Sequence, residues 1–131
     1  MTSPSLFPEV ETLLVAFLET LVDSSDQVNT ETPADFTGLT PFIRAYRFGG
    51  GTDRFTDVAE VQLDVFHPLR SVGLPLARQI QSLLIGPPPP VVMFDRIECP
   101  LAPREMDWGD DETIRRWGAT YTVVSRRRSF T

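Results

Sequence analysis

The sequence predicts one α+β domain in which two amphipathic helices pack on a four-stranded, mainly antiparallel sheet, in the order α-β-β-α-β-β. Three observations lead to this fold class. Two stretches repeat apolar residues every three or four positions, two alternating runs flank a triple glycine, and two more alternating runs lie near the C-terminus. A length of 131 residues suits one core, so residues 1–131 are taken as a single domain.

The first helix is expected over residues 7–22, because its apolar positions fall on one helical face. Pro8 suits the first turn, where no amide donor is needed, and Glu9 and Glu11 suit the positive end of the helix dipole. The face consists of Val10, Leu13, Leu14, Phe17, Leu18 and Leu21. Residues 23–40 then form a long polar connection, with room for a short extra strand around Val28.

A β-hairpin is expected next, because residues 42–48 and 58–66 alternate apolar and polar side chains. The glycines at 49, 50 and 51 allow the positive φ that a chain reversal needs. A phosphate-binding loop fits less well. The Walker pattern requires a lysine, which this chain lacks, and a dinucleotide fingerprint requires a helix where a strand follows.

The second helix is expected over residues 71–85, with Gly86 as its C-terminal cap and four prolines at 87–90 as a spacer. Two strands follow, over residues 91–101 and 115–127. In the last strand one face is rich in aromatic residues, through Trp117, Ala119, Tyr121 and Val123. The loop 102–114 between these strands gathers acidic residues around Trp108 and is expected to be exposed.

Composition argues against several classes of protein. A hydrophobic fraction of 41% fits a soluble globular chain, and the longest apolar run, residues 13–18, is far short of the roughly 20 residues that cross a bilayer. The N-terminus has no basic region ahead of an apolar one, so no secretory signal is predicted. One histidine, His67, and one cysteine, Cys99, are too few for a zinc site.

No catalytic set, cofactor or metal is predicted. The acids at 107, 110, 111 and 112 do not follow the spacing of an EF-hand, so they are interpreted as a solvated loop. His67 has no recognisable nucleophile motif beside it, and nothing near Cys99 marks an activated thiol.

Charge is unevenly distributed along the chain, whose net charge is −6. Every charged residue before Arg44 is acidic, whereas residues 126–128 are three arginines. Such asymmetry allows the acidic flank of one subunit to meet the basic flank of another. The acidic total argues against tight DNA binding, which depends on displacing counterions with cationic groups.

Residues 39–50 (LTPFIRAYRFGG) and 57–66 (DVAEVQLDVF) resemble the tail terminator, or tail completion, proteins of long-tailed bacteriophages. That family shows a similar pattern: a proline-led strand ending in paired glycines, an aspartate that opens an alternating strand, and then a helix. Residues 77–84 and 116–121 also look like the family, so the resemblance covers about residues 7–127.

The resemblance implies a small α+β subunit that forms a homo-oligomeric ring, commonly of six, at the head-proximal end of the tail tube. Such a ring stops tube growth and gives the head connector a docking surface. The implied partners are other copies, the tail tube protein and the head-tail connector protein, with genomic DNA passing through the lumen without tight binding. The implied location is the virion tail, assembled in the host cytoplasm, and the implied role is structural rather than enzymatic.

Interface residues are predicted in the glycine loop, the acidic loop and the C-terminal arginines. They are Gly49, Gly50, Gly51, Asp53, Arg54, Asp107, Trp108, Arg126 and Arg127. A head-tail connector or another minor tail protein is the nearest alternative. A small enzyme or ligand-binding module would instead gather His67, Cys99 and acids in a deep pocket, and an RNA-binding domain would expose aromatic rings on a basic sheet face.

Overall fold

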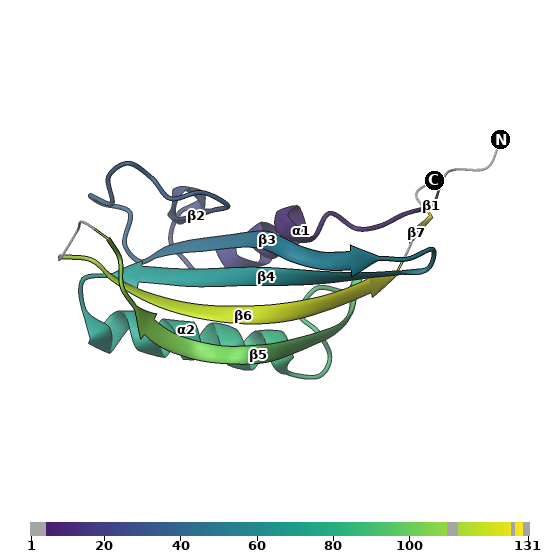
Figure 1. Ribbon diagram of the computed structural model, residues 1–131. Coiled ribbons are helices and arrows are strands. Elements are labelled where there is room, and N and C mark those ends of the chain that lie inside the picture. Colours follow the sequence, from purple (N-terminus) through teal and green to yellow (C-terminus); the bar gives the residue numbers. More distant parts are fainter. Residues whose placement is uncertain (1–4, 110–112, 127, 130–131) are drawn as a thin grey trace.

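The computed structural model describes residues 5–109, 113–126 and 128–129, and it shows an α+β fold with two helices and a five-stranded mixed sheet (Figure 1). The strands of this sheet are β2 (Val28–Asn29), β3 (Phe42–Thr52), β4 (Thr56–His67), β5 (Phe94–Met106) and β6 (Arg115–Arg126). Their order in the sheet is β2-β3-β4-β6-β5. Neighbouring long strands are antiparallel, and β2 runs parallel to β3. The predicted order of the long elements is confirmed, whereas the predicted four-stranded sheet lacked β2.

The extra strand β2 forms because the polar connection after the first helix is locally ordered. A short 3-10 helix, η1 (Ser25–Gln27), begins with a capping box. In it the Gln27 side-chain oxygen accepts a hydrogen bond from the Ser24 backbone N–H at 2.9 Å. The same Gln27 side chain donates to the Pro41 carbonyl at 3.0 Å. This contact ties the connection to the start of β3, so that Val28 pairs with Ile43.

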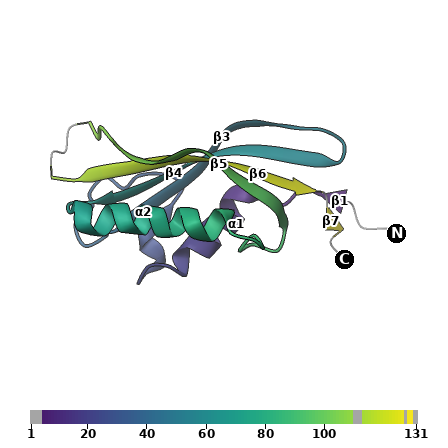
Figure 2. The same cartoon turned by 90° about the horizontal axis from the view of Figure 1, so that it is seen from below.

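Both helices, α1 (Val10–Glu19) and α2 (Arg70–Ile85), lie on the same face of the sheet (Figure 2). The first is shorter than predicted, because Pro8 precedes its N-cap and its last turn tightens through a Leu21 to Leu18 backbone bond. Gly86 is the C-cap of α2 as predicted, and its backbone there is extended, with φ −71°. Within α2, a Cβ at Gly73 would lie 2.0 Å from the Trp117 ring, so glycine allows this helix to approach β6 closely.

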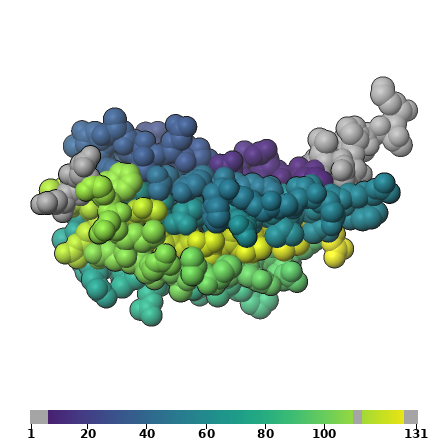
Figure 3. Space-filling model, viewed as in Figure 1, coloured from purple at the N-terminus to yellow at the C-terminus, as the bar shows by residue number. Residues whose placement is uncertain are grey.

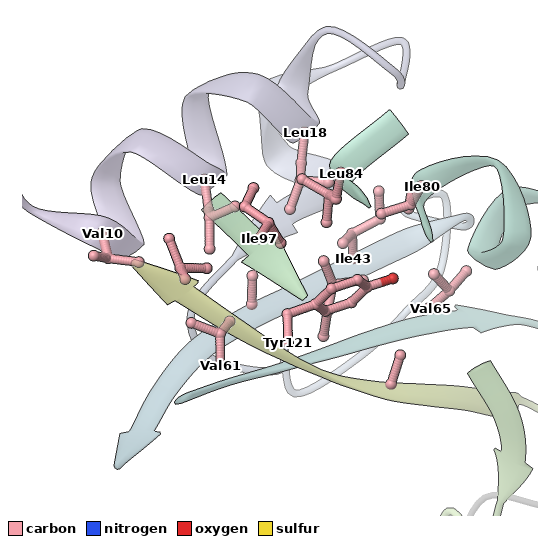
Figure 4. Close-up of a cluster of buried hydrophobic side chains, with 14 of the residues drawn as sticks. Val10, Leu14, Leu18, Ile43, Val61, Val65, Ile80, Leu84, Ile97 and Tyr121 are labelled. Carbon is pink, nitrogen blue, oxygen red and sulfur yellow. The ribbon is translucent and has the colours of Figure 1, made fainter. Parts of the chain in front are cut away.

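The main core lies between the helices and the sheet (Figure 4). Leu14 and Leu18 from α1 and Ile80 and Leu84 from α2 are buried, and each such side chain contributes about 1.5–3 kcal/mol by leaving water. The predicted apolar face of β6 is confirmed. Its members are all buried, namely Trp117, Ala119, Tyr121 and Val123.

Some strand ends differ from the prediction. β3 continues through the glycines, so the chain reverses at residues 53–55 rather than within the triple glycine. β5 begins at Phe94 rather than at residue 91. β5 runs on to Met106 with register shifts around its prolines, Pro100 and Pro103, which shortens the acidic loop.

The first and last segments that the structure describes lie side by side (Figure 1). A two-stranded sheet joins β1 (Ser5–Leu6) to β7 (Arg128–Ser129) next to the tip of the β3–β4 hairpin. No helix in the described ranges is long and apolar enough to cross a membrane.

Candidate interaction surfaces

The β3–β4 hairpin extends beyond the helices at one end of the sheet, and residues 48–56 are called the hairpin arm below (Figures 1 and 2). Two large apolar side chains on this arm face solvent, Phe48 with 52% of its area exposed and Phe55 with 69%. Exposed aromatic rings on a projecting element are typical of contact surfaces, because ordered water around them is released on binding.

The tip of the hairpin arm is held by an aspartate and not by glycine. The Asp53 carboxylate accepts the backbone N–H groups of Phe55 at 2.8 Å and Thr56 at 2.7 Å. These two hydrogen bonds lower the pKa of Asp53. Asp53 and Arg54 thus sit at the turn as predicted interface residues, with both side chains at the surface.

Glycine has a different role within the arm. Gly50 has φ +110°, and a Cβ there would lie 1.9 Å from the Val58 carbonyl oxygen. A register shift between Arg47 and Gly49 accompanies this close approach. The triple glycine therefore lets β3 bulge against β4, which is a correction to the predicted reversal.

The base of the hairpin arm is fixed by an ion pair between the buried Asp57 and the half-buried Arg47. Arg47 donates to both oxygens of Asp57, at 2.8 and 2.9 Å, and the Thr52 hydroxyl donates to the same carboxylate at 2.6 Å. Burial raises the pKa of Asp57, but the bonds from Arg47 and Thr52 outweigh it and leave the pKa below its usual value. A hollow of about 210 Å³ beside this pair is also lined by Glu9 and Glu11.

At the opposite end of the sheet, aromatic side chains from two loops cover the face that lacks helices. Phe36, from the connection before β3, packs against Phe66 with ring centroids 5.1 Å apart, and Trp108 packs against Phe66 at 4.8 Å. We call these three rings, together with Phe42, the aromatic cluster. Trp108 is half-buried by these contacts, so the predicted exposed loop is wrong at this residue, while Asp107 is exposed.

Beside the aromatic cluster a fully buried carboxylate lies between two arginines. Asp64 on β4 accepts hydrogen bonds from Arg44 on β3 and Arg116 on β6, both through Nε at 3.0 Å. Gln62 donates to the same carboxylate at 2.9 Å. The Arg44 guanidinium also lies 5.6 Å from the Phe66 ring centroid, so it joins the charge cluster to the aromatic cluster.

The sequence analysis missed this Arg44–Asp64–Arg116 cluster. Its signal was present, because all three residues occupy the polar positions of alternating strands. Which polar positions come together depends on strand order, and the register places Arg44 opposite Asp64 and Phe66 opposite Arg116. A hollow of about 500 Å³ between this cluster and Trp108 is lined by Asp35, Asp107 and Arg116 among others.

The predicted interface residues therefore form two groups. Gly49, Gly50, Gly51, Asp53 and Arg54 lie in the arm, and Arg126 lies beside it, opposite Thr56 and 2.9 Å from Asp95. Asp107 and Trp108 lie at the aromatic end. The β4 residues that mark the two ends, Thr56 and Phe66, are ten positions apart, or about 33 Å along a strand. Arg127 lies outside the described residues.

His67 and Cys99 do not share a site. His67 ends β4 and accepts the Leu69 amide at 2.9 Å through Nδ1. Cys99 lies within β5, where burial raises the pKa of its thiol. Neither residue lines the hollow beside Arg47 and Asp57 or the hollow beside Trp108. Among the described residues, no group of three or more His, Cys, Asp or Glu side chains is placed to hold a metal ion.

No protein-family model matches the chain, and no curated protein is significantly similar to it.

Proposed function

We propose that this protein is a structural subunit of a phage tail that forms a hexameric ring on the head-proximal end of the tail tube. The ring ends tube growth and offers the docking surface for the head connector. The observation that carries the proposal is the position of the resembling residues: LTPFIRAYRFGG and DVAEVQLDVF form a single hairpin, and its arm extends past both helices.

The hairpin arm supports an assembly role because its exterior and its base have different chemistry. Phe48 and Phe55 are exposed, whereas Arg47 and Asp57 fix the base through two hydrogen bonds. A rigid arm with exposed aromatic rings loses little conformational entropy when it binds a neighbour or a tube.

The sheet face opposite the helices supports the same role. Figure 3 shows this face, with β4 and β6 as its central strands. Between the aromatic cluster and the arm, the β4 and β6 side chains on this face are Val58, Glu60, Gln62, Thr120, Thr122 and Val124, and none of them is basic. The outer strand β5 adds exposed Arg96, Glu98 and Arg104, of which Arg96 is paired with Glu98. A central band without positive charge lets DNA pass without retaining its phosphates.

The dispersed placement of His67 and Cys99 gives an enzymatic role little support, because general base and nucleophile must lie within hydrogen-bonding distance. An RNA-binding role has little support either, since Phe42 and Phe66 are buried in the aromatic cluster and are not available for stacking on bases.

The proposal is tested by adding the purified protein to tubes assembled from the tail tube protein of the same virus. Negative-stain images are expected to show a ring on one end of each tube, and tubes grown in its presence are expected to be shorter. Binding to the head connector without binding to tubes would identify a connector protein instead. A protein that is monomeric at every concentration and binds neither partner would contradict the proposal.

A further inference from the structure

The two helices carry matching rows of side chains with opposite charge. Along α1, Glu11, Val15 and Glu19 follow one another at intervals of four residues. Along α2, Arg70, Leu74 and Arg78 do the same. Positions four residues apart lie on one side of a helix, and eight residues span about 12 Å, so the charges in both rows have the same spacing.

The α1 row faces the β2 edge of the sheet. A hollow of about 470 Å³ runs along it, lined by Glu11, Val15 and Glu19 and by Asn29 and Thr30 at the end of β2. Val15 is half-buried and lies between the two carboxylates. The row therefore offers an apolar centre between two negative charges at an open edge.

The α2 row faces the opposite edge. Leu74 and Gln81 are seven residues apart and share one side of α2, and the Gln81 amide lies 3.7 Å from Cys99 Sγ on β5, the other outermost strand. Arg70 and Arg78 are exposed, and Leu74 between them is half-buried. No acidic residue occurs anywhere in α2.

The charges of these rows have few partners within their own chain. Glu19, Arg70 and Arg78 form no ion pair in the part of the molecule that the structure describes. Glu11 lies nearer to a base, because it lines the same hollow as Arg47, so Glu19 is the charge of the α1 row that has no ion-pair partner among the described residues.

We infer that the Arg70–Leu74–Arg78 row of one copy packs against the Glu11–Val15–Glu19 row of the next copy. The occupant is a second copy because one chain carries both halves of the complementary pattern, with equal spacing and opposite sign, at opposite sheet edges. A contact between unlike patches leaves one row free on each side, so further copies add in the same sense until a ring closes. The inference rests on the proposed ring and assigns its subunit contact.

The test reverses the charges of the two rows in the full-length protein and asks whether mixing complementary variants restores assembly. Glu19→Arg and Arg78→Glu are each expected to weaken self-association about tenfold or more, measured by sedimentation velocity and native mass spectrometry at low salt. Glu60→Arg is the matched control, because Glu60 is exposed on the sheet face away from both helices. Equal mixtures of a variant reversed at 11 and 19 with one reversed at 70 and 78 are expected to assemble, although each alone does not.

Circular dichroism shows whether each variant is folded, and the self-association of each folded variant is compared with that of the wild type. Assembly that is insensitive to the four reversals, or that is lost equally with Glu60→Arg, would overturn the inferred contact. Rings that cap tubes yet ignore the reversals would overturn only the contact and leave the proposed function standing. Recovery in the mixture without tube capping would support the contact and contradict the tail role.

Discussion

The two ends of the sheet differ in the exposure of their aromatic rings and in the surroundings of their ion pairs. At the aromatic end, Phe36, Phe66 and Trp108 cover one another, and Asp64 is fully buried between two arginines. At the arm end, Phe48 and Phe55 are exposed, and the ion pair of Arg47 and Asp57 fixes the base of a projecting hairpin. The comparison teaches that aromatic rings can stabilise one end of a sheet by packing together and stay exposed at the other end, where we propose that they contact a partner.

Replacing the buried carboxylate of the aromatic end is expected to have the largest effect. Asp64→Ala leaves Arg44 and Arg116 close together without their shared partner, and breaking such a pair costs about 3–5 kcal/mol. Urea denaturation monitored by tryptophan fluorescence measures the free energy of unfolding. Glu60→Ala, an exposed change on the same strand, is the control and is expected to stay within about 0.5 kcal/mol. Equal losses of stability in Asp64→Ala and Glu60→Ala would show that the buried carboxylate does not stabilise the aromatic end more than an exposed one does.

Within the arm, two adjacent glycines are expected to differ. Gly50→Ala places a methyl group against the Val58 carbonyl at positive φ and is expected to destabilise the protein by about 1–3 kcal/mol. Gly51→Ala meets no atom within 4 Å, so its effect is expected to be near zero. Thermal unfolding of the two variants makes the comparison, and a Gly51→Ala variant as unstable as Gly50→Ala would show that the glycines serve general flexibility.

The ion pair at the base of the arm is expected to make stability depend on pH. The folded pKa of Asp57 is lower than that of the unfolded chain, so its contribution is complete above the unfolded value of about 3.9 and is lost as the pH falls through the folded pKa. The loss of stability between neutral pH and about pH 3 is expected to be smaller in Asp57→Asn than in the wild type. Identical pH profiles of the two proteins would contradict this role for Asp57.

The exposed ring at the tip is expected to have the smallest effect on stability. Phe55→Ser removes a side chain that is 69% exposed, so the free energy of unfolding is expected to change by less than about 0.5 kcal/mol. The same variant is expected to bind tail tubes more weakly in a pelleting assay, because the arm is the proposed contact element. Unchanged tube binding by a folded Phe55→Ser protein would contradict the proposal that the arm contacts the tail tube.

Helical and strand periodicity predicted most of the architecture. The spacing of Val10, Leu14 and Leu18 identified α1, and the alternation in β6 identified the face that buries Trp117 and Tyr121. These patterns are local, since a residue's face depends only on its position along its own helix or strand. The parallel strand β2 was less visible, because two residues carry no periodicity and depend on the Gln27 contact with Pro41.

By itself the sequence determined the α+β class, the order of the long elements, the presence of the hairpin and the acidic character of the chain before Arg44. The turn at Asp53 is also local, because its carboxylate accepts amides only two and three residues away. Tertiary structure alone decided that Trp108 packs inward and that Arg44, Asp64 and Arg116 meet. The physical reason is sequence separation. Arg44 and Arg116 are brought to one carboxylate by the pairing of β3, β4 and β6, and no local pattern specifies which strands become neighbours.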